Sequence, residues 1–259
     1  MRIIISPAKK MRVDRDSFPV RDLPILLPRA EVLAKRLRSM SYEELKDLWR
    51  CNDHIAAVNV ERLQNMDLRH GLTPAILSYD GIQYQYMAPG VFTEEELEYV
   101  QGHLRILSGF YGVLRPFDGV TPYRLEMQAR LSICESKNLY SYWGNSIAEA
   151  IWSETDYVID LASKEYSQCV SRYQPADKRL ITCVFGERKG GRIIEKGTLC
   201  KMARGEMVRY MAQLQVEDPE VLRDFDRLGY RFSEEESGPS VYVYLKESTK
   251  QKLDAAWAE

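Results

Sequence analysis

The chain of 259 residues is 45% hydrophobic and 29% charged with a formal net charge of −2, which indicates a soluble globular protein and argues against a uniformly basic nucleic-acid binder. No apolar run approaches the ~20 residues of a membrane-spanning helix and no signal peptide opens the chain, so we expect a cytoplasmic protein without a membrane partner. The five cysteines are scattered without a CxxC pair, which favours reduced thiols over a disulfide framework or a zinc site.

The N-terminal part of the chain predicts a strand followed by helices. The β-branched residues 3–5 indicate a buried strand that ends in a loop at Ser6. Prolines, apolar spacing and two capping patterns then predict an extended arm over 14–28 and helices over 29–39, 42–49 and 53–65. A turn signal at Asp80 predicts a hairpin with strands at 75–79 and 82–86.

A longer helix is expected in the middle of the chain. Thr93 with Glu96 forms a capping-box pattern, and apolar residues follow at helical spacing as far as position 107. Gly109 would end this helix, and Gly112 follows in a tight Gly-x-x-Gly turn before a second apolar run. This layout is similar to a helix-hairpin-helix module, whose glycine turn lets backbone amides meet a DNA phosphate. A glycine-capped helix that turns into a loop is the alternative.

The C-terminal half predicts alternating strands and helices. In chain order we expect a helix over 146–152, a strand over 157–161, a hairpin of 180–185 and 192–199, helices over 202–213 and 219–228, and a strand over 240–245. The sequence contains no repeat, low-complexity segment or linker. The elements therefore predict one α/β domain over 1–259, in which a mixed sheet is flanked by helices.

Two strand-and-loop segments share one pattern. Ser6 and Lys9 follow the strand at 3–5, and Ser163 and Lys164 follow the strand at 157–161. Ligands of α/β proteins bind at strand ends. A serine hydroxyl, loop amides and a lysine together can cradle a phosphate group. The same pattern is equally compatible with two ordinary solvated loops.

Basic residues are concentrated in two segments. Residues 1–38 hold ten basic and four acidic residues, and residues 172–205 hold nine and three. Within the second segment, Lys201 and Arg204 would lie on adjacent turns of a helix and could touch successive phosphates, whereas Arg209 lies off that face. A basic face on a nearly neutral protein can bind a polyanion, unless the segments intermix in space and their charges cancel.

Two further arginines stand in segments that proline makes rigid. Arg115 precedes Pro116, and Arg124 follows Pro122 by two positions. An arginine held in this way loses less entropy when it contacts a phosphate or a carboxylate. A structural ion pair, for instance with Glu126, is the competing use.

No catalytic or metal-binding constellation is evident. The three histidines stand far apart, and Cys51 with His54 supplies two ligands where structural zinc needs a closed set. A serine of either loop could act as a nucleophile with the neighbouring lysine as base, but no third orienting residue is visible. We therefore predict no metal and no cofactor, and we favour a protein without catalytic activity.

Several short blocks, in this order, resemble the YaaA family of bacterial peroxide-stress proteins nearly end to end. The matching blocks are ISPAK at 5–9, HLRILSGFYGVLRPFDGVTPYRLEM at 103–127, LYSYWG at 139–144, LASKEY at 161–166, KMARGEMVRY at 201–210 and LGYRF at 228–232. The resemblance implies a cytosolic protein that protects against hydrogen peroxide and limits iron-driven oxidative damage to DNA. His54 stands where members of the family often show lysine, so a cationic role at this position does not carry over.

The resemblance also implies binding to duplex or branched DNA without sequence preference, through a basic cleft and a helix-hairpin-helix-like element on a family-specific fold. It carries over no catalytic residue. From the residues and the resemblance together, the candidate DNA- or phosphate-contacting residues are Ser6, Lys9, Arg105, Gly109, Gly112, Arg115, Arg124, Ser163, Lys164, Lys201, Arg204 and Arg209.

A second hypothesis is an enzyme that acts on a small phosphorylated or amine substrate at the two Ser-Lys loops. A deep closed pocket at these loops would favour the enzyme, whereas an open basic groove wide enough for a duplex would favour DNA binding. Iron sequestration is a further alternative, and so is partner binding through two acidic segments, residues 41–100 with eleven acidic and four basic residues and residues 215–236 with eight and three. The oligomeric state stays open.

Overall fold

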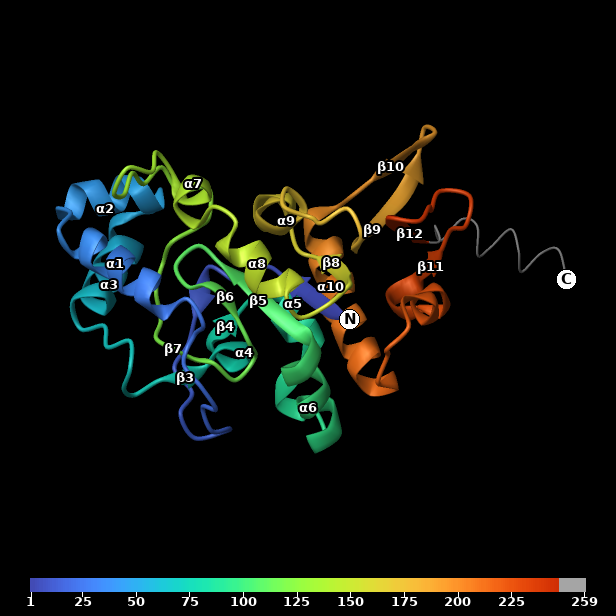
Figure 1. The fold of residues 1–259 in the computed structure, drawn as a ribbon, viewed down its shortest axis with the longest axis horizontal. Helices are drawn as coiled ribbons and strands as arrows, with labels where there is room; N and C mark the ends of the chain where they lie inside the picture. Colours follow the sequence, from blue (N-terminus) through green and yellow to red (C-terminus); the bar gives the residue numbers. More distant parts are fainter. Residues whose placement is uncertain (247–259) are drawn as a thin grey trace, which may run out of the picture.

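A mixed β-sheet forms the centre of the molecule (Figure 1). The computed structural model describes residues 1–246. Across the sheet, the strands run in the order β11 (Tyr230–Phe232), β12 (Val241–Lys246), β9 (Arg179–Lys189), β8 (Tyr157–Leu161), β1 (Arg2–Ile5), β5 (Leu104–Ser108) and β6 (Gly112–Leu114). A further strand, β10 (Arg192–Ile194), forms a projecting hairpin with β9.

The five inner strands are parallel, and the edge strands β11 and β6 are antiparallel to their neighbours. Strand β1 lies between β8 and β5, with Ile3 opposite Ile159 on one side and Leu104 on the other. Parallel strands that are covered on both faces are apolar at nearly every position. This explains why the uninterrupted run from Ile3 to Ile5 is fully buried.

Helices lie on both sides of the sheet (Figure 1). One group of helices lies together at the left of Figure 1. It consists of α1 (Leu27–Arg38), α2 (Tyr42–Trp49), α3 (Asp53–Gln64) and α7 (Leu139–Trp143). The others are α4 (Ala75–Ser78), α5 (Ile82–Met87), α6 (Glu94–His103), α8 (Ser146–Trp152), α9 (Lys164–Ser171) and α10 (Gly197–Leu214), with the 3₁₀ turns η1 (Pro89–Val91), η2 (Pro219–Asp224) and η3 (Arg227–Gly229). Helix α10 packs against α5 and α6, and α8 packs against α9.

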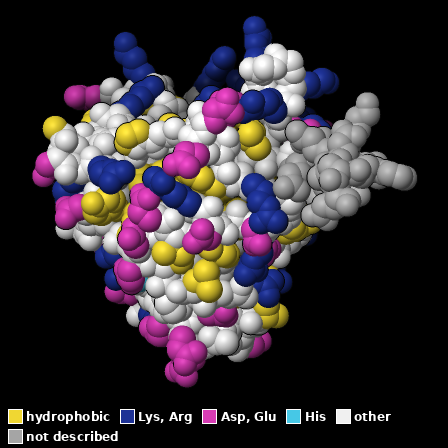
Figure 2. All heavy atoms as spheres, turned by 90° about the vertical axis from the view of Figure 1, so that its right-hand side faces the viewer, with side chains coloured by type: hydrophobic (Ala, Val, Ile, Leu, Met, Phe, Trp, Pro, Cys, Tyr) yellow, Lys and Arg dark blue, Asp and Glu magenta, His cyan; other side chains and the backbone are white. Residues whose placement is uncertain are grey.

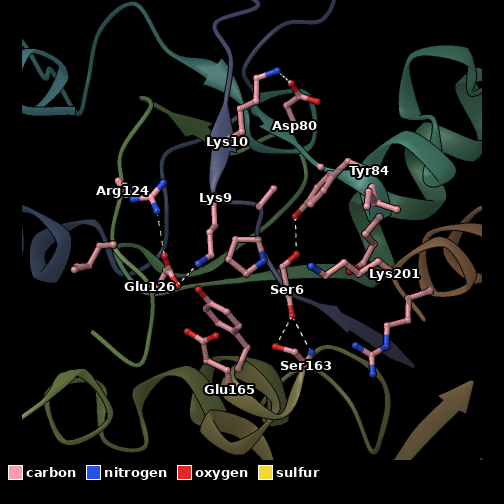
Figure 3. Close-up of a pocket in the computed structure, with 18 of the residues that line it drawn as sticks. Ser6, Lys9, Lys10, Asp80, Tyr84, Arg124, Glu126, Ser163, Glu165 and Lys201 are labelled. Atoms are coloured by element: carbon pink, nitrogen blue, oxygen red, sulfur yellow. Dashed lines mark hydrogen bonds and ion pairs between the residues drawn. The ribbon is translucent and has the colours of Figure 1, made fainter. Parts of the chain in front are cut away.

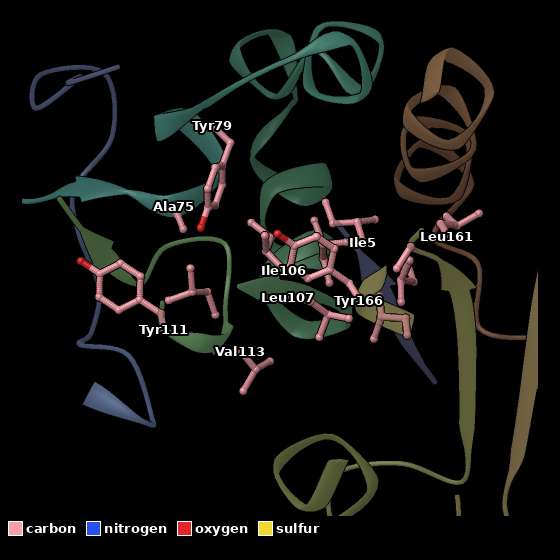
Figure 4. Packing of buried hydrophobic residues seen from close by; sticks show 14 of the residues in the cluster. Ile5, Ala75, Tyr79, Ile106, Leu107, Tyr111, Val113, Leu161 and Tyr166 are labelled. Atoms are coloured by element: carbon pink, nitrogen blue, oxygen red, sulfur yellow. The ribbon is translucent and has the colours of Figure 1, made fainter. Parts of the chain in front are cut away.

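Two small sheets complete the fold, β2 (Lys10–Met11) with β4 (Tyr79–Asp80) and β3 (Thr73–Pro74) with β7 (Gly119–Val120). The main core lies against the inner strands. Figure 4 shows Ile5, Ile106 and Leu161, which occupy facing register positions on β1, β5 and β8. Their full burial ties these three strands into one rigid platform. The described residues thus form a single compact α/β domain, as the sequence predicts.

Most predicted elements are confirmed. Both capping boxes are present, at Ser41 with Glu44 and at Thr93 with Glu96. The strand over 157–161 is β8, and the Gly190-Gly191 turn joins β9 to β10. Strand β10 ends early, at residue 194, because helix α10 begins at Gly197. The expected helix over 219–228 consists of the short 3₁₀ turns η2 and η3.

The hairpin predicted around Asp80 is wrong. Residues 75–78 form helix α4, and the second expected strand is helix α5. Short apolar runs do not reveal by themselves whether they belong to a strand or to a buried helix. Here the packing of α5 on α10 decides the outcome. The backbone of Gln83 lies against Gly205 of α10, in space that a larger side chain at position 205 would fill.

The predicted helix-hairpin-helix element is also wrong. Helix α6 ends at His103, and the residues that follow form the antiparallel hairpin β5–β6. The hydroxyl of Ser108 accepts hydrogen bonds from the backbone amides of Phe110 at 3.1 Å and Tyr111 at 2.8 Å, which closes the turn. Apolar residues at positions 104 and 107 fit a helix by spacing, but all of 104–108 is buried, as in a central strand.

Figure 2 shows one face of the molecule, on which basic and acidic side chains intermingle. The segregation of charge along the sequence therefore does not produce a continuous basic surface on this face. The ion pair between Arg188 and Glu236, at 2.6 Å, joins one of the basic segments to an acidic one.

Candidate functional site

The loops after β1 and β8 lie side by side at the carboxyl-terminal edge of the sheet. Because β1 and β8 are parallel neighbours with Ile5 opposite Leu161, the chain leaves both strands at the same place. The hydroxyl of Ser6 accepts a hydrogen bond from the backbone amide of Ser163 at 2.8 Å, and the two hydroxyl oxygens are 3.2 Å apart. The register of the sheet thus joins the two segments that share the Ser-Lys pattern.

A pocket of about 410 Å³ opens over these loops (Figure 3). This volume falls in the range of ~300–1,000 Å³ that small-molecule sites occupy. Its walls come from the loop after β1, the β4–α5 segment, residues 123–126, the start of α9 and helix α10. The polar or charged side chains that line it are Ser6, Lys9, Lys10, Asp80, Gln83, Tyr84, Tyr123, Arg124, Glu126, Ser163, Glu165, Tyr166, Lys201 and Arg204.

Basic side chains outnumber acidic ones in this lining, by five to three. Lys9 pairs with Glu126 at 2.8 Å, and Lys10 pairs with Asp80 at 2.5 Å. Lys201 is exposed and has no ion-pair partner within residues 1–246. Figure 3 shows Lys9 and Glu126 on one side of Ser6 and Lys201 on the other. The pocket therefore carries an excess of positive charge, part of which is not neutralised by neighbouring carboxylates.

Three buried donors at the pocket lack a hydrogen-bond partner among the described residues: Gln83 Nε2, Arg124 Nε and Arg204 Nε. Arg124 and Arg204 also form long ion pairs, at 3.6 Å, with Glu126 and Glu195. Buried polar groups in native structures almost always have partners. All three unpaired atoms are N–H donors, so the group that would satisfy them is an acceptor, such as a phosphate, a carboxylate or a carbonyl oxygen.

Tyrosines form the floor of the pocket. Tyr84 donates a hydrogen bond from its hydroxyl to the backbone oxygen of Ser6 at 3.0 Å. The hydroxyl of Tyr123 is hydrogen-bonded to Tyr79 at 2.8 Å and to Ser108 at 2.6 Å. Burial raises the pKa of Tyr123 to about 12, so the ring stays neutral at physiological pH. With their hydroxyls engaged, these rings present mainly carbon surface to a ligand.

The acidic side of the pocket is set by Glu165, the second residue of α9. Burial raises the pKa of this carboxyl, and the negative charge of Glu126 acts in the same direction. The Gln128 amide donates a hydrogen bond to the Glu165 carboxylate at 3.2 Å. Protonation of Glu165 would increase the excess of positive charge and favour an anionic ligand.

The structure brings together six of the residues that the sequence analysis selects. Ser6, Lys9, Arg124, Ser163, Lys201 and Arg204 all line the pocket. Lys164 is exposed at the start of α9 but does not line it. The six residues come from four distant parts of the chain, at 6–9, 124, 163 and 201–204, and the contact of each with a ligand stays a prediction.

The glycines of the β5–β6 turn lie in the interior, so the prediction that they offer amides to phosphate is wrong. A Cβ atom on Gly109 would lie 2.5 Å from the backbone oxygen of Leu125. Gly112 has a φ of 76°, and the side chain of Trp143 packs 3.0 Å from its Cβ position. Both glycines serve close chain packing, because any larger residue would displace a neighbour.

The remaining selected arginines lie outside the pocket. Arg105 is 4% exposed and pairs with Glu154 at 2.7 Å, at the amino-terminal edge of the sheet. Arg115 pairs with Asp118 at 3.0 Å. Arg209 does not line the pocket, and its buried Nε atom has no hydrogen-bond partner in the described part of the chain. The sequence neighbours of an arginine do not show on which edge of a sheet its side chain will lie.

Sequence reasoning missed several residues of the site. The sequence predicts a strand at Gln83 and a turn at Asp80. It indicates no role for Glu165 and Tyr166 beyond their place in the LASKEY block. The clearest available signal was the position of Glu165, which directly follows a Ser-Lys pair at a strand end.

No group of three or more His, Cys, Asp or Glu side chains within residues 1–246 is arranged to hold a metal ion. None of the helices in the same range combines the length and the apolar character needed to cross a membrane.

Comparison with known proteins identifies relatives over nearly the whole chain. A family model described as "Peroxide stress protein YaaA" matches residues 1–236. A UPF0246 protein of Lachnoclostridium phytofermentans is 54% identical over 246 residues, which cover 95% of this chain and 96% of the relative. UPF0246 proteins of Agathobacter rectalis and Pediococcus pentosaceus are 52% and 48% identical, over 94% and 95% of this chain and 98% of each relative.

Proposed function

The chain belongs to the YaaA family of peroxide stress proteins, and from this premise we propose that it binds the DNA backbone without sequence preference at the Ser6–Ser163 pocket, and so protects DNA or assists its repair. The observation that carries the proposal is the convergence of unpaired buried donors and excess positive charge at one pocket. Phosphate oxygens are acceptors that carry negative charge, so they satisfy both features at once.

The ion pairs at the rim of the pocket can be exchanged at low cost. The side chains of Lys9 and Lys10 are 65% and 78% exposed, although each pairs with a carboxylate. Exposed ion pairs contribute only ~0–1 kcal/mol. A phosphate can therefore compete with Glu126 and Asp80 for these lysines, whereas the two carboxylates are themselves only 20% and 24% exposed.

Phosphate contacts fix the position of a protein on DNA but carry no base information. Binding of this kind suits a stress protein, because oxidative damage occurs throughout the genome and not at one sequence. We propose a cytosolic protein that acts on DNA, and the pocket offers no group that would require a metal or another cofactor for this binding.

The proposal is tested by fluorescence anisotropy with labelled duplexes of two unrelated sequences at several salt concentrations. If four to six phosphates are contacted, the logarithm of affinity should fall with the logarithm of salt concentration at a slope of roughly −4 to −5. The two sequences should bind with equal affinity. Absence of binding at low salt, or an affinity that does not respond to salt, would refute the proposal.

The pocket volume favours a second candidate, an enzyme or receptor for a small phosphorylated or amine compound. A cavity of about 410 Å³ has the size of a small-ligand site, whereas a duplex could contact it only through backbone groups at its opening. Calorimetric titration with nucleoside monophosphates and with simple amines separates the two candidates. Tight binding of a free small molecule, with no binding to DNA, would support the second candidate alone.

A further inference from the structure

We propose that the pocket receives a single unstacked nucleotide of DNA, with its phosphate near Lys201 and Arg204 and its base against Gln83 and the tyrosine floor. This inference rests on the proposed DNA binding and specifies which part of the DNA enters the cavity. It follows from three features of the pocket, which are a cationic end, an apolar body and one unpaired amide.

The cationic end is formed by Lys201 and Arg204 of α10, which line the pocket together with Ser163. Lys201 is exposed without an ion-pair partner in residues 1–246, and the Nε atom of Arg204 is buried without a hydrogen bond in the same range. Ser163 precedes the first residue of α9, and its side chain makes no capping hydrogen bond. The positive end of this eight-residue helix therefore adds to the two cations, although the carboxylate of Glu165 in its first turn offsets part of this charge. A phosphate at this end would meet both cations and the helix terminus.

The body of the pocket is apolar. Pro7, Ile82 and Leu125 line it together with the buried rings of Tyr84 and Tyr166. The hydroxyl of Tyr84 is already engaged with the Ser6 backbone. A base has two apolar faces, and stacking on aromatic or apolar side chains is how proteins hold an unstacked base. This part of the pocket suits a flat aromatic group better than it suits a second phosphate.

Gln83 supplies the polar contact within this apolar body. Its side chain is 7% exposed and lines the pocket, and its Nε2 atom has no hydrogen-bond partner among residues 1–246. A buried amide of this kind fits the edge of a base, which carries carbonyl and ring-nitrogen acceptors. A free phosphate would satisfy the arginines, but it would leave the apolar body empty.

The support for this arrangement is rigid. Gly205 lies directly under the backbone of Gln83 and one residue after Arg204. The contact between α5 and α10 thus holds the base-contacting amide and the cationic end in a fixed relation. A site held by packed helices is organised before the ligand arrives, which lowers the entropic cost of binding.

The size of the cavity decides which DNA it prefers. A base in an intact duplex is stacked and paired, and it must leave the helix before it can enter the pocket. The cost of this step is least for a mismatched, bulged or terminal nucleotide. The protein should therefore bind duplexes that contain one unpaired nucleotide more tightly than fully paired duplexes.

The test uses the full-length protein and two duplexes that differ by one bulged nucleotide. Wild-type protein should bind the bulged duplex about tenfold more tightly. The variant Gln83→Leu should lose this preference, so that its affinities for the bulged and the paired duplex become equal. Lys189→Gln, an exposed lysine on the β9–β10 hairpin, is the matched control and should keep the preference.

A second measurement does not depend on the folding of a variant. A 2-aminopurine placed at the bulge should change its fluorescence when wild-type protein binds, and deoxynucleoside monophosphate should compete with the bulged duplex. Equal affinity for both duplexes with an unchanged 2-aminopurine signal would overturn the inference while DNA binding itself stands. Failure of both duplexes to bind at low salt would instead refute the proposed function.

Discussion

The backbone carbonyl oxygen of Gln83 occupies the space in which a side chain on Gly205 would lie. A Cβ atom at position 205 would overlap this oxygen, and it would also lie 3.0 Å from the amide nitrogen of Met87. Helix α5 is therefore seated on α10 backbone against backbone. This contact joins the segment that was predicted as a strand to the helix that carries Lys201 and Arg204.

We expect Gly205→Ala to destabilise the protein, although alanine is the better helix former. Helix propensity favours alanine by ~1 kcal/mol, but the obstruction is rigid backbone, and overpacking of this kind costs roughly 1–3 kcal/mol. Urea denaturation should show a net loss of stability. Gly102→Ala in α6 is the control, because no atom lies within 4 Å of its Cβ position, and it should be neutral or stabilising. Equal effects of the two substitutions would contradict this prediction.

Lys201→Gln should weaken DNA binding without affecting the stability of the fold. Lys201 is exposed, and substitutions at such positions shift stability by less than ~0.5 kcal/mol. Loss of one phosphate contact should reduce the magnitude of the salt slope by about 1. The side chain of Arg204 is only 15% exposed, so this argument from exposure applies to Lys201 and not to Arg204.

Anisotropy titration and a melting curve of the same sample test the Lys201 prediction. Lys189→Gln removes an equal charge away from the pocket and should leave the salt slope unchanged. An unchanged dissociation constant for Lys201→Gln, with an unchanged melting temperature, would place the DNA site elsewhere.

Stability should depend on the ionisation of Asp118, which is fully buried beside Arg115. Burial raises the pKa of this carboxyl to about 6 from its ordinary value of 3.8. The folded state therefore holds the proton more tightly than the unfolded state, and the contribution of the protonated carboxyl is lost as pH rises from about 4 to about 6.

Urea denaturation at several pH values tests this linkage. The stability of wild type relative to Asp118→Asn should fall between about pH 4 and pH 6 and stay level above that, because asparagine does not ionise. If the stability of wild type relative to Asp118→Asn instead rises with pH over this window, then Arg115 lowers the pKa of Asp118, through its charge and its backbone amide, by more than burial raises it.

The cysteines should not act as the peroxide sensor. Burial raises the pKa of Cys169 and of Cys183 to about 12, and it also raises the pKa of Cys200, where the charge of Glu195 acts in the same direction. Peroxide reacts with the accessible thiolate. The cations after Cys200 therefore do not make it a reactive thiolate.

Replacement of all five cysteines by serine or alanine should leave DNA affinity unchanged before and after peroxide treatment. In native wild-type protein, maleimide should label the exposed Cys134 first and the buried Cys183 last, as read by mass spectrometry. A peroxide-dependent affinity that is present in wild type and lost in the cysteine-free variant would establish a redox switch.

Local chemistry in the sequence was sufficient to predict many of the elements. The capping boxes at Ser41 and Thr93 correctly predict where helices begin. In each box, the cap side chain accepts a hydrogen bond from the backbone amide three positions later, and the glutamate at that position accepts one from the backbone amide of the cap residue. The buried strands over 3–5 and 157–161 are recognisable because a strand covered on both faces is apolar at nearly every position, with the buried Asp160 as the exception in the second strand. Family membership was also predictable, since the matching blocks extend along most of the chain.

Only the tertiary structure decided where the β5–β6 hairpin lies and which side chains form the pocket. Apolar spacing at residues 104 and 107 fits a helix and a central strand alike, and burial against both faces of the sheet selects the strand. The parallel register of β1 with β8 brings Ser6 to Ser163, and the packing of Gly205 on Gln83 adds a buried amide. Such contacts join residues that are distant in sequence, so no local pattern determines them. The same register leaves Arg105 at the opposite edge of the sheet, paired with Glu154.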